Sequence, residues 1–417
     1  MTRSKKTAPP AISDAATQYA QEVVSGKRIA GPHVRGQCAR HLWDIEDGHK
    51  RGLVWNVEES EKAQGFYADV LKLSGGDFEG KPFELLPWQK FVVGSLFGWK
   101  GVDGYRRFRV AYVETAKGSG KSPLAAGIGM KGLVADSEPR AEVYSAATKK
   151  DQAMILFRDA VAMVDQSPEL SKRLTKSGTG ERCWNLAYMA QGAFFRPISS
   201  DDGQSGPRPH IGLIDELHEH KTNTVVEMMR AGTKSRRQAL IFMITNAGHS
   251  RMGPCWSYHE YGVKVAAGEV EDDAFFPFVC GLDESDDPFA DESCWPKANP
   301  SLQDADLPGM KYIREQVVES KGMPSKEAIV RRLNFCQWTD AESPWISGEV
   351  WRGAQREFDW QDLRGRRAVA GLDLSSTTDL TALVFLVEPE KDGEPWHIVP
   401  FCWLPEVELE RKAETDR

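Results

Sequence analysis

The sequence predicts an α/β fold in which a mostly parallel sheet carries a phosphate-binding loop. An apolar run at 110–113 leads into a loop with two glycines and a Lys-Ser pair, and a run of small residues typical of a helix follows. From about 105 to 250, strand-like and helical patterns alternate, as they do where helices join parallel strands and cover both faces of a sheet. A strand, loop and helix in this order can hold a triphosphate on backbone N–H groups.

The composition indicates a folded, cytosolic protein. Its 417 residues are enough for two or three domains, with 41% apolar residues and 13 tryptophans to build their cores. No apolar run reaches the length that crosses a bilayer, and no signal-peptide core follows the basic start. The seven cysteines are scattered and odd in number, so we expect free thiols. Cys38 and His41 lack a second pair at zinc-ligand spacing, and we interpret them as structural residues.

The charge of the chain is acidic overall and uneven along the sequence. A net charge of −8 argues against a basic coat for nucleic acid. Ten acidic residues lie between 269 and 292, whereas four basic residues lie close together: Arg230, Lys234, Arg236 and Arg237. Such a basic cluster is either a local contact for a phosphate backbone or a solvated surface.

The expected elements follow from hydrophobic periodicity and helix signals. Helices are expected at 15–24, 34–45 and 60–73, and a further helix should begin at Pro87. Strands are then expected at 108–115, 141–147, 193–198, 210–214 and 239–245, with helices at 122–134, 150–165 and 222–232. Beyond 250 the pattern is irregular and acidic until two more helices, at 309–321 and 325–334.

A separate strand pattern begins at 367. Three runs, 368–374, 381–387 and 396–403, have short joins and predict a β-meander. One sheet in about 50 residues is too small for a domain, so we expect the chain to be C-terminally truncated. The predicted domains are a helical N-terminal region (1–80), a P-loop ATPase domain (81–345), a linker (346–366) and the incomplete start of another domain (367–417).

The phosphate loop supplies the first site residues. Residues 115–122 fit the pattern G-x-x-x-x-G-K-[ST] except at the first position, which is Thr115. Lys121 is predicted to place its ammonium on the β- and γ-phosphates, and Ser122 to ligate Mg²⁺. Gly118 and Gly120 let the backbone approach the phosphates closely. The alternative is a surface turn before a helix.

A second strand, 211–214, ends in Asp215 and Glu216. The carboxyl end of a buried parallel strand faces the ligand crevice, so Asp215 is predicted to hold Mg²⁺ and Glu216 to deprotonate the attacking water. The alternative is a pair of acids at a helix N-terminus, where they are favourable in any case. His218 and His220 follow directly, and we interpret them as residues of a helix start rather than as zinc ligands.

A third strand, 239–244, ends in the small polar residues 245–248. Thr245 and Asn246 are predicted to sense the γ-phosphate and to couple its loss to movement, although Asn-Ala-Gly is also an ordinary turn.

Two further polar residues stand in apolar surroundings. The carboxamide of Gln89 can pair with the edge of adenine, and the alternative is an exposed helix glutamine. Asp373 lies in the middle of an apolar strand, where a carboxylate is costly to bury unless it binds a cation. It is therefore a candidate first ligand of a two-metal nuclease that uses Mg²⁺ or Mn²⁺.

Taken together, these motifs resemble the large terminase subunit of tailed bacteriophages, an ATP-driven motor and nuclease that packages DNA into proheads. The likeness covers residues 19–27, 86–89, 115–122, 213–216, 245–248, 295–300, 333–338 and 371–374. It implies a P-loop ATPase of the additional-strand, catalytic-glutamate type, followed by a ribonuclease H-like nuclease from 367. The further nuclease acids of that family would lie beyond residue 417, so we do not expect this chain to cleave DNA.

The resemblance also implies roles and partners. The adenine contact falls on Gln89, the phosphate-loop pair on Lys121 and Ser122, and the metal-binding and catalytic acids on Asp215 and Glu216. The coupling motif falls on 245–248, the first nuclease acid on Asp373, and a position that is often Arg in the family on Lys117. Candidates for an arginine acting in trans are Arg230, Arg236 and Arg237. Implied partners are ATP, Mg²⁺, double-stranded phage DNA, the portal protein, the small terminase subunit and further copies in a ring. The resemblance implies no membrane partner, and it implies a location in the cytoplasm of the infected bacterium and, transiently, on the prohead.

Two other functions use the same residues. A helicase-like or other nucleic-acid-dependent P-loop ATPase shares the glutamine, the phosphate loop and the two-acid strand, but a second helicase core is missing from the sequence. A non-catalytic nucleotide-binding protein would not need both Lys121 and Glu216.

Overall fold

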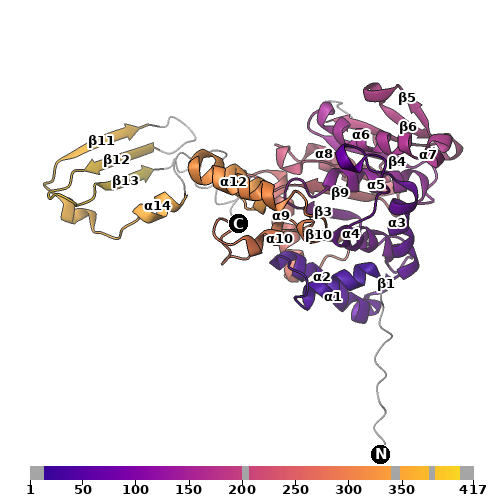
Figure 1. The fold of residues 1–417 in the computed structure, drawn as a ribbon, viewed down its shortest axis with the longest axis horizontal. Helices are drawn as coiled ribbons and strands as arrows, with labels where there is room; N and C mark the ends of the chain where they lie inside the picture. The colour runs from indigo at the N-terminus through magenta and orange to yellow at the C-terminus, as the bar shows by residue number, and fades with distance from the viewer. Residues whose placement is uncertain (1–13, 200–205, 340–347, 375–380, 404–417) are drawn as a thin grey trace, which may run out of the picture. The chain divides into compact units, whose positions relative to one another are not determined.

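The computed structural model describes residues 14–199, 206–339, 348–374 and 381–403. The chain divides into two compact units, residues 1–345 and 346–417 (Figure 1). Each unit is described by itself. Among the described residues, no helix combines the length and the apolarity that a membrane span requires.

The first unit begins with helices, as expected. They are α1 (Ala15–Val24), α2 (Pro32–Asp47), α3 (Val57–Val70) and α4 (Pro87–Gly98), and a short ladder pairs β1 (Val54–Trp55) with β2 (Trp99–Lys100). Asp14 caps α1, because its side chain accepts the N–H groups of Ala16 and Thr17. Cys38 is fully buried in α2, and the described residues hold no metal-binding group of three or more His, Cys, Asp or Glu side chains.

His41 of α2 is a buried structural residue. The indole N–H of Trp99 donates to its Nδ1 (3.0 Å), and its Nε2 lies 3.2 Å from Thr17 Oγ1. An indole nitrogen can only donate, so Nδ1 is the acceptor and the ring proton sits on Nε2. Burial lowers the pKa of His41 to about 4.

We expect the protonation of His41 to make the first unit less stable at pH 5 than at pH 7. In the unfolded chain His41 takes up a proton near pH 6.5, whereas in the folded chain it does so only near pH 4. The unfolded state therefore binds more protons in this window, and the free energy of unfolding falls as the pH falls, by about 2 kcal/mol between pH 7 and 5. Urea unfolding at the two pH values measures the loss. His41→Asn, which does not titrate, should lose less over the same step, and an equal loss would contradict the assignment.

An eight-stranded sheet forms the centre of the first unit, in the order β10-β3-β9-β8-β4-β7-β6-β5. Its strands are β3 (Val110–Glu114), β4 (Glu142–Ala147), β5 (Thr175–Ser177), β6 (Asn185–Tyr188), β7 (Ala193–Ser199), β8 (Ile211–Ile214), β9 (Leu240–Thr245) and β10 (Phe275–Val279). From β10 to β7 all neighbours are parallel, and β5 and β6 extend the sheet in antiparallel fashion. The five expected strands and the mostly parallel sheet are confirmed, whereas β5, β6 and β10 were not expected.

Helices cover both faces of this sheet, as Figure 1 shows. They are α5 (Lys121–Val134), α6 (Lys150–Gln166), α7 (Pro168–Arg173), α8 (Thr224–Gly232) and α9 (Pro254–Ala267). The alternation along β3 separates the two cores: Ala111 and Val113 belong to the core with α4 and α5, and Tyr112 to the core with α8 and α9. Helix α9 lies where an irregular segment was expected.

The rest of the first unit is helical and forms a small core of its own. Its helices are α10 (Trp295–Ala298), α11 (Leu302–Ala305), α12 (Met310–Gly322) and α13 (Glu327–Phe335), and their apolar side chains pack around Trp295 and Phe335. The two expected helices, 309–321 and 325–334, are confirmed.

The second unit contains α14 (Gly348–Ala354) and a three-stranded antiparallel sheet of β11 (Ala368–Asp373), β12 (Thr381–Val387) and β13 (His397–Trp403). The expected β-meander is confirmed. Asp373 ends β11 and is exposed, as is every residue of that strand. The argument from a buried carboxylate was therefore wrong for this residue, and its proposed metal role depends on the resemblance alone.

Candidate active site

The phosphate loop connects β3 to α5 with two glycines in left-handed backbone conformations. Gly118 has φ +87° and Gly120 has φ +83°, values that other residues adopt only with strain. Side chains would also collide here, because a Cβ on Gly118 would lie 2.8 Å from the Cβ of Pro308. Thr115, in the position that is usually glycine, is not among the residues with positive φ, so the loop accommodates it without strain.

Lys121 begins α5 and is buried. Its ammonium donates to the carbonyl oxygens of Thr115 and Ala116 (3.0 Å each) and to Oδ1 of Asn246 (2.6 Å). Burial lowers the pKa of Lys121, and the carboxylates of Glu216 and Asp215 oppose that effect. The ammonium is thus held by oxygens of the protein next to the first turn of the helix, whose N–H groups have no partner inside the helix.

The two acids follow β8 at the same edge of the sheet. Burial, followed by the charge of Glu216, raises the pKa of Asp215 to about 7. Burial also raises the pKa of Glu216, and the ammonium groups of Lys121 and Lys117 oppose the increase. The backbone N–H of Glu216 donates to Oδ1 of Asp215 (2.9 Å).

The backbone of Glu216 is strained. Its φ of +45° and ψ of +55° place a residue with a long side chain in the left-handed region. Such a conformation costs of the order of 1–3 kcal/mol and is concentrated at functional sites. It turns the chain sharply at the end of β8, directly before the 3₁₀ turn Leu217–Glu219 that carries His218.

Asn246 joins the two sides of the site. Its Oδ1 accepts from Lys121 (2.6 Å), and its Nδ2 lies 3.4 Å from Oε2 of Glu216. Thr245, one residue earlier, accepts the backbone N–H of His218 at its Oγ1 (3.1 Å). The structure thus brings together the predicted residues of three strands: β3 with its loop, β8 and β9.

A segment far along the chain fixes the phosphate loop from outside. The backbone N–H of Ala116 donates to the carbonyl of Ala298 (3.1 Å), and that of Lys117 to the carbonyl of Leu333 (2.8 Å). Ser301 donates its hydroxyl to the carbonyl of Ser119 (3.0 Å) and accepts the indole N–H of Trp88 (2.8 Å). Sequence reasoning did not find Ser301, since its partners lie 182 and 213 residues away.

Gln89 lies beside the loop but is already engaged. Its Oε1 accepts the backbone N–H of Leu86 (2.9 Å) at the start of α4, and only 3% of the residue is exposed. A Cβ on Gly120 would lie 3.3 Å from its Nε2. The alternative of an exposed glutamine was therefore wrong. For Gln89 to pair with adenine through both Oε1 and Nε2, we expect Oε1 to release the N–H of Leu86.

A buried acid that no sequence pattern indicated lies directly before the phosphate loop. Glu114, the last residue of β3, is fully buried and accepts from Tyr112 O–H (2.6 Å) and from Trp338 Nε1 (3.1 Å), while His259 Nδ1 lies 2.8 Å away. A Cβ on Gly248 would lie 2.7 Å from the ring of Trp338. Trp338 thus contacts both the strand that leads into the phosphate loop and the end of the coupling motif.

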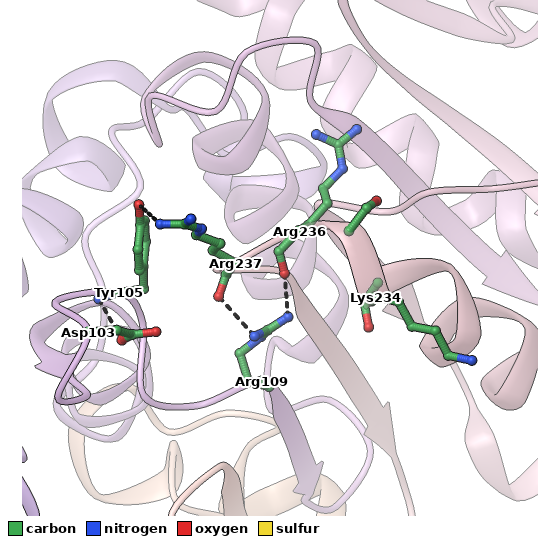
Figure 2. A pocket seen from close by; sticks show the side chains of 8 residues that line it. Asp103, Tyr105, Arg109, Lys234, Arg236 and Arg237 are labelled. Carbon is green, nitrogen blue, oxygen red and sulfur yellow. Dashed lines mark hydrogen bonds between the residues drawn. The ribbon is translucent and has the colours of Figure 1, made fainter.

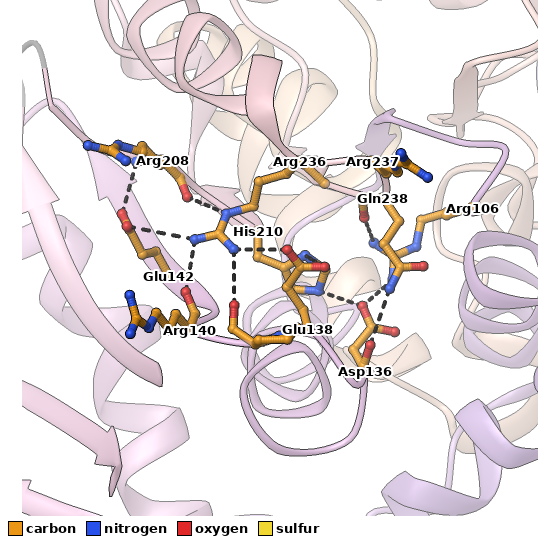
Figure 3. Close-up of polar contacts among 12 residues, drawn as sticks. Arg106, Asp136, Glu138, Arg140, Glu142, Arg208, His210, Arg236, Arg237 and Gln238 are labelled. Carbon is orange, nitrogen blue, oxygen red and sulfur yellow. Dashed lines mark hydrogen bonds and ion pairs between the residues drawn. The ribbon is translucent and has the colours of Figure 1, made fainter. Parts of the chain in front are cut away.

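The basic cluster lies at the other edge of the sheet, where the strands begin. Figure 3 shows the Arg236 guanidinium bonded to the carbonyls of Arg208 and Arg140 (2.8 and 2.9 Å) and to Oε1 of Glu138 (2.9 Å). With all these bonds in place, Arg236 is a structural residue and a poor candidate for an arginine acting in trans. Beside it, Asp136 pairs with Arg106 and forms a hydrogen bond with His210. Burial alone would raise the pKa of Asp136, but the charge of Arg106 and the bond to His210 hold it far below its usual range.

The oxygen donors of the site suit a hard divalent cation. The Ser122 hydroxyl and the Asp215 carboxylate are ligands that Mg²⁺ accepts, with phosphate oxygens and water completing its coordination. His218 and His220 belong to no metal-binding cluster in the part of the chain that the structure describes.

Fold and site define a P-loop nucleoside triphosphatase whose acidic residues follow a neighbouring parallel strand. Comparison with known proteins makes this more specific. The family model of the terminase large subunit ATPase domain matches residues 87–264, and that of the terminase large subunit endonuclease domain matches residues 269–417. The chain belongs to the terminase large subunits, with an ATPase domain and an endonuclease domain.

Two proteins and a solved structure are similar to this chain. The large terminase subunit of Enterobacteria phage HK97 is 27% identical over 368 residues, which are 87% of this chain and 68% of that protein. Protein YmfN of Escherichia coli K12 is 26% identical over 207 residues, 48% of this chain and 44% of that protein. The crystal structure of the HK97 large terminase matches with a TM-score of 0.57 at 25% identity, over 86% of this chain and 70% of that one. The two family models meet between 264 and 269, whereas the structural units divide at 345–346.

Proposed function

We propose that ATP binds at the phosphate loop and that its hydrolysis drives double-stranded DNA into a prohead. The observation that carries the proposal is the chain of contacts from Lys121 through Asn246 to Glu216. The three residues come from different elements, and a bound γ-phosphate would compete with Asn246 for the ammonium of Lys121. Release of Asn246 would then change its contact with Glu216, which couples nucleotide occupancy to the catalytic acid.

Each residue has a defined task in this proposal. Gly118, Gly120 and Lys117 cradle the phosphates, Lys121 neutralises their charge, and Glu216 orients and deprotonates the attacking water. Ser122 and Asp215 would hold Mg²⁺, which supplies charge neutralisation between the phosphates. Thr245 and Asn246 couple phosphate loss to movement. Gln89 would contact the adenine after releasing Leu86.

The partners and the domain division are part of the same proposal. The motor acts as a ring of copies on the portal protein, with the small terminase subunit and phage DNA, in the cytoplasm of the infected bacterium. The domains are a helical region (1–80), the ATPase (81–345), a linker (346–366) and a ribonuclease H-like nuclease from 367. In the nuclease, Asp373 is the first acid and would bind Mg²⁺ or Mn²⁺.

ATP turnover by the purified chain tests the proposal. We expect hydrolysis that requires Mg²⁺, stops on chelation with EDTA and is faster in the presence of long duplex DNA. Absence of hydrolysis with and without DNA would contradict the motor. ATP-driven separation of the strands of a short duplex would instead favour the helicase-like alternative.

A further inference from the structure

A cleft of about 660 Å³ opens at the edge of the sheet where β3 and β9 begin (Figure 2). We call it the basic cleft; its lining residues are Asp103, Tyr105, Arg109, Thr233, Lys234, Ser235, Arg236 and Arg237. The nucleotide site lies at the opposite ends of the same strands.

Arg109 forms the base of the basic cleft and fixes its shape. Its guanidinium donates to the carbonyl oxygens of Arg236 (2.7 Å), Arg237 (2.8 Å) and Ala239 (2.9 Å). Figure 2 shows two of these bonds running up to the chain before β9. Within the described residues, no ion pair joins Arg109 to a carboxylate, and Asp103 is the acid whose charge acts on it.

Two exposed cations stand above this base. Arg237 donates to the hydroxyl of Tyr105 (3.2 Å), and its guanidinium lies 5.4 Å from the centroid of that ring, which holds the side chain in place. Lys234 is exposed on the other side of the cleft. Arg236 contributes little, because Glu138 and Glu142 pair with it outside the cleft.

The charge of the basic cleft is therefore positive in an acidic protein. Asp103 is the one acid among the lining residues, against the cations Arg109, Lys234 and Arg237, and one of its oxygens already accepts the backbone N–H of Tyr105. The whole chain has a net charge of −8. A local surplus of positive charge of this kind attracts polyanions to the cleft, whereas the rest of an acidic protein surface repels them.

We propose that the basic cleft holds the phosphate backbone of duplex DNA, with Lys234 and Arg237 as the contacting residues; this rests on the proposed DNA-translocating function. The hydrogen bond to Tyr105 uses one nitrogen of the Arg237 guanidinium, and a guanidinium fork matches the oxygens of a phosphate. The lining offers cations and hydroxyls but no set of amides arranged for base edges. The contact is thus independent of sequence, as a motor that moves along DNA requires.

Strands β3 and β9 run from the basic cleft to the nucleotide site. Strand β3 begins next to Arg109 and leads to the phosphate loop, and β9 begins three residues after Arg237 and ends at Thr245. At about 3.3 Å per residue, β3 with five residues spans about 16 Å and β9 with six residues about 20 Å. DNA phosphates and nucleotide phosphates would then act on the two ends of the same pair of strands.

Duplex binding by the full chain as a function of salt tests the proposal. The double variant Lys234→Ala/Arg237→Ala and wild type are titrated with a fluorescent 30-base-pair duplex of random sequence between 50 and 200 mM salt. Loss of two phosphate contacts should weaken binding by on the order of a hundredfold near 0.1 M salt and lower the slope of log K against log salt by about 2. At a protein concentration too low for copies of the chain to assemble, where no arginine can act in trans, ATP turnover without DNA should stay at the wild-type rate. Arg237→Lys, which keeps the charge, should keep the salt slope.

Controls separate this idea from its competitors. Lys311→Ala/Lys321→Ala removes the same charge from exposed positions of α12 and should leave binding unchanged. If both double variants lose the same DNA affinity, or neither loses any, the assignment of the basic cleft is overturned. The proposed motor function still stands in that case, provided that wild type binds DNA. Loss of ATP turnover only at high protein concentration, with normal DNA binding, would make the cleft a contact between subunits and overturn the proposal. A wild-type chain that binds no duplex at any salt concentration overturns both proposals.

Discussion

Glu216→Gln is expected to lower the rate of ATP hydrolysis by a factor of about 10²–10⁴ and to leave nucleotide binding close to wild type. The substitution keeps the shape of the side chain and an oxygen that can face Nδ2 of Asn246, but it removes the group that accepts a proton from water. Burial raises the pKa of Glu216, and a more basic carboxylate is a better proton acceptor near neutral pH. Steady-state phosphate release gives the rate, and a fluorescent ATP analogue gives the affinity.

Glu219→Gln is the matched control for this variant. Glu219 lies three residues further along, is mostly exposed and lies 3.1 Å from Nε2 of His218, whose Nδ1 lies 3.3 Å from Glu216. The same charge is thus removed from a residue that acts on Glu216 only through His218 and through its charge. Its turnover should remain within about twofold of wild type. Hydrolysis by Glu216→Gln within tenfold of wild type would contradict the role of Glu216 as the base.

Local patterns predicted most of the nucleotide site. Its residues occupy the ends of three buried strands, the loop with two glycines or the start of the helix after it, and these signals are local in sequence. Parallel strands deliver their carboxyl ends to one edge of a sheet, so the convergence of Lys121, Asp215 and Asn246 follows from the alternation of strands and helices. Their hydrogen bonds with one another could not be predicted.

Elements that break a local rule were missed. Strand β10 contains Pro277 in an acidic stretch, and proline normally argues against a strand. It is tolerated because β10 is an edge strand, a property that only the completed sheet reveals. Helix α9 had a proline at its first turn and Gly268 after its end, signals that the irregular, acidic stretch around it obscured.

The other residues near the site that could not be predicted are held there by contacts between distant parts of the sequence. The hydroxyl of Ser301 and the indole of Trp338 meet the phosphate-loop region across 182 and 224 residues of sequence, and neither has a local signal. Gln89 shows the converse case. A base-binding role was expected, yet its position three residues after Leu86 also makes it a helix-capping residue, and the structure has the latter bond.

Lys121→Ala is expected to weaken ATP binding by roughly a hundredfold, equivalent to about 3 kcal/mol, and to abolish measurable turnover. Lys121 is a buried cation at the start of α5, and its ammonium lies against the carbonyl oxygens of the phosphate loop. Without it, the remaining N–H groups of the loop would face the phosphate charge alone. Isothermal titration with ATP and Mg²⁺ measures the affinity.

The unfolding of the nucleotide-free chain should change much less. Burial lowers the pKa of Lys121, so part of the energy of its three hydrogen bonds only offsets the cost of placing a charge in the interior. ATP with Mg²⁺ should therefore raise the melting temperature of wild type and of Lys311→Ala but not of Lys121→Ala. If Lys121→Ala melted far below wild type without nucleotide, the lysine would be a structural residue of the loop. Unchanged affinity in a stable Lys121→Ala protein would remove the phosphate loop from the nucleotide site altogether.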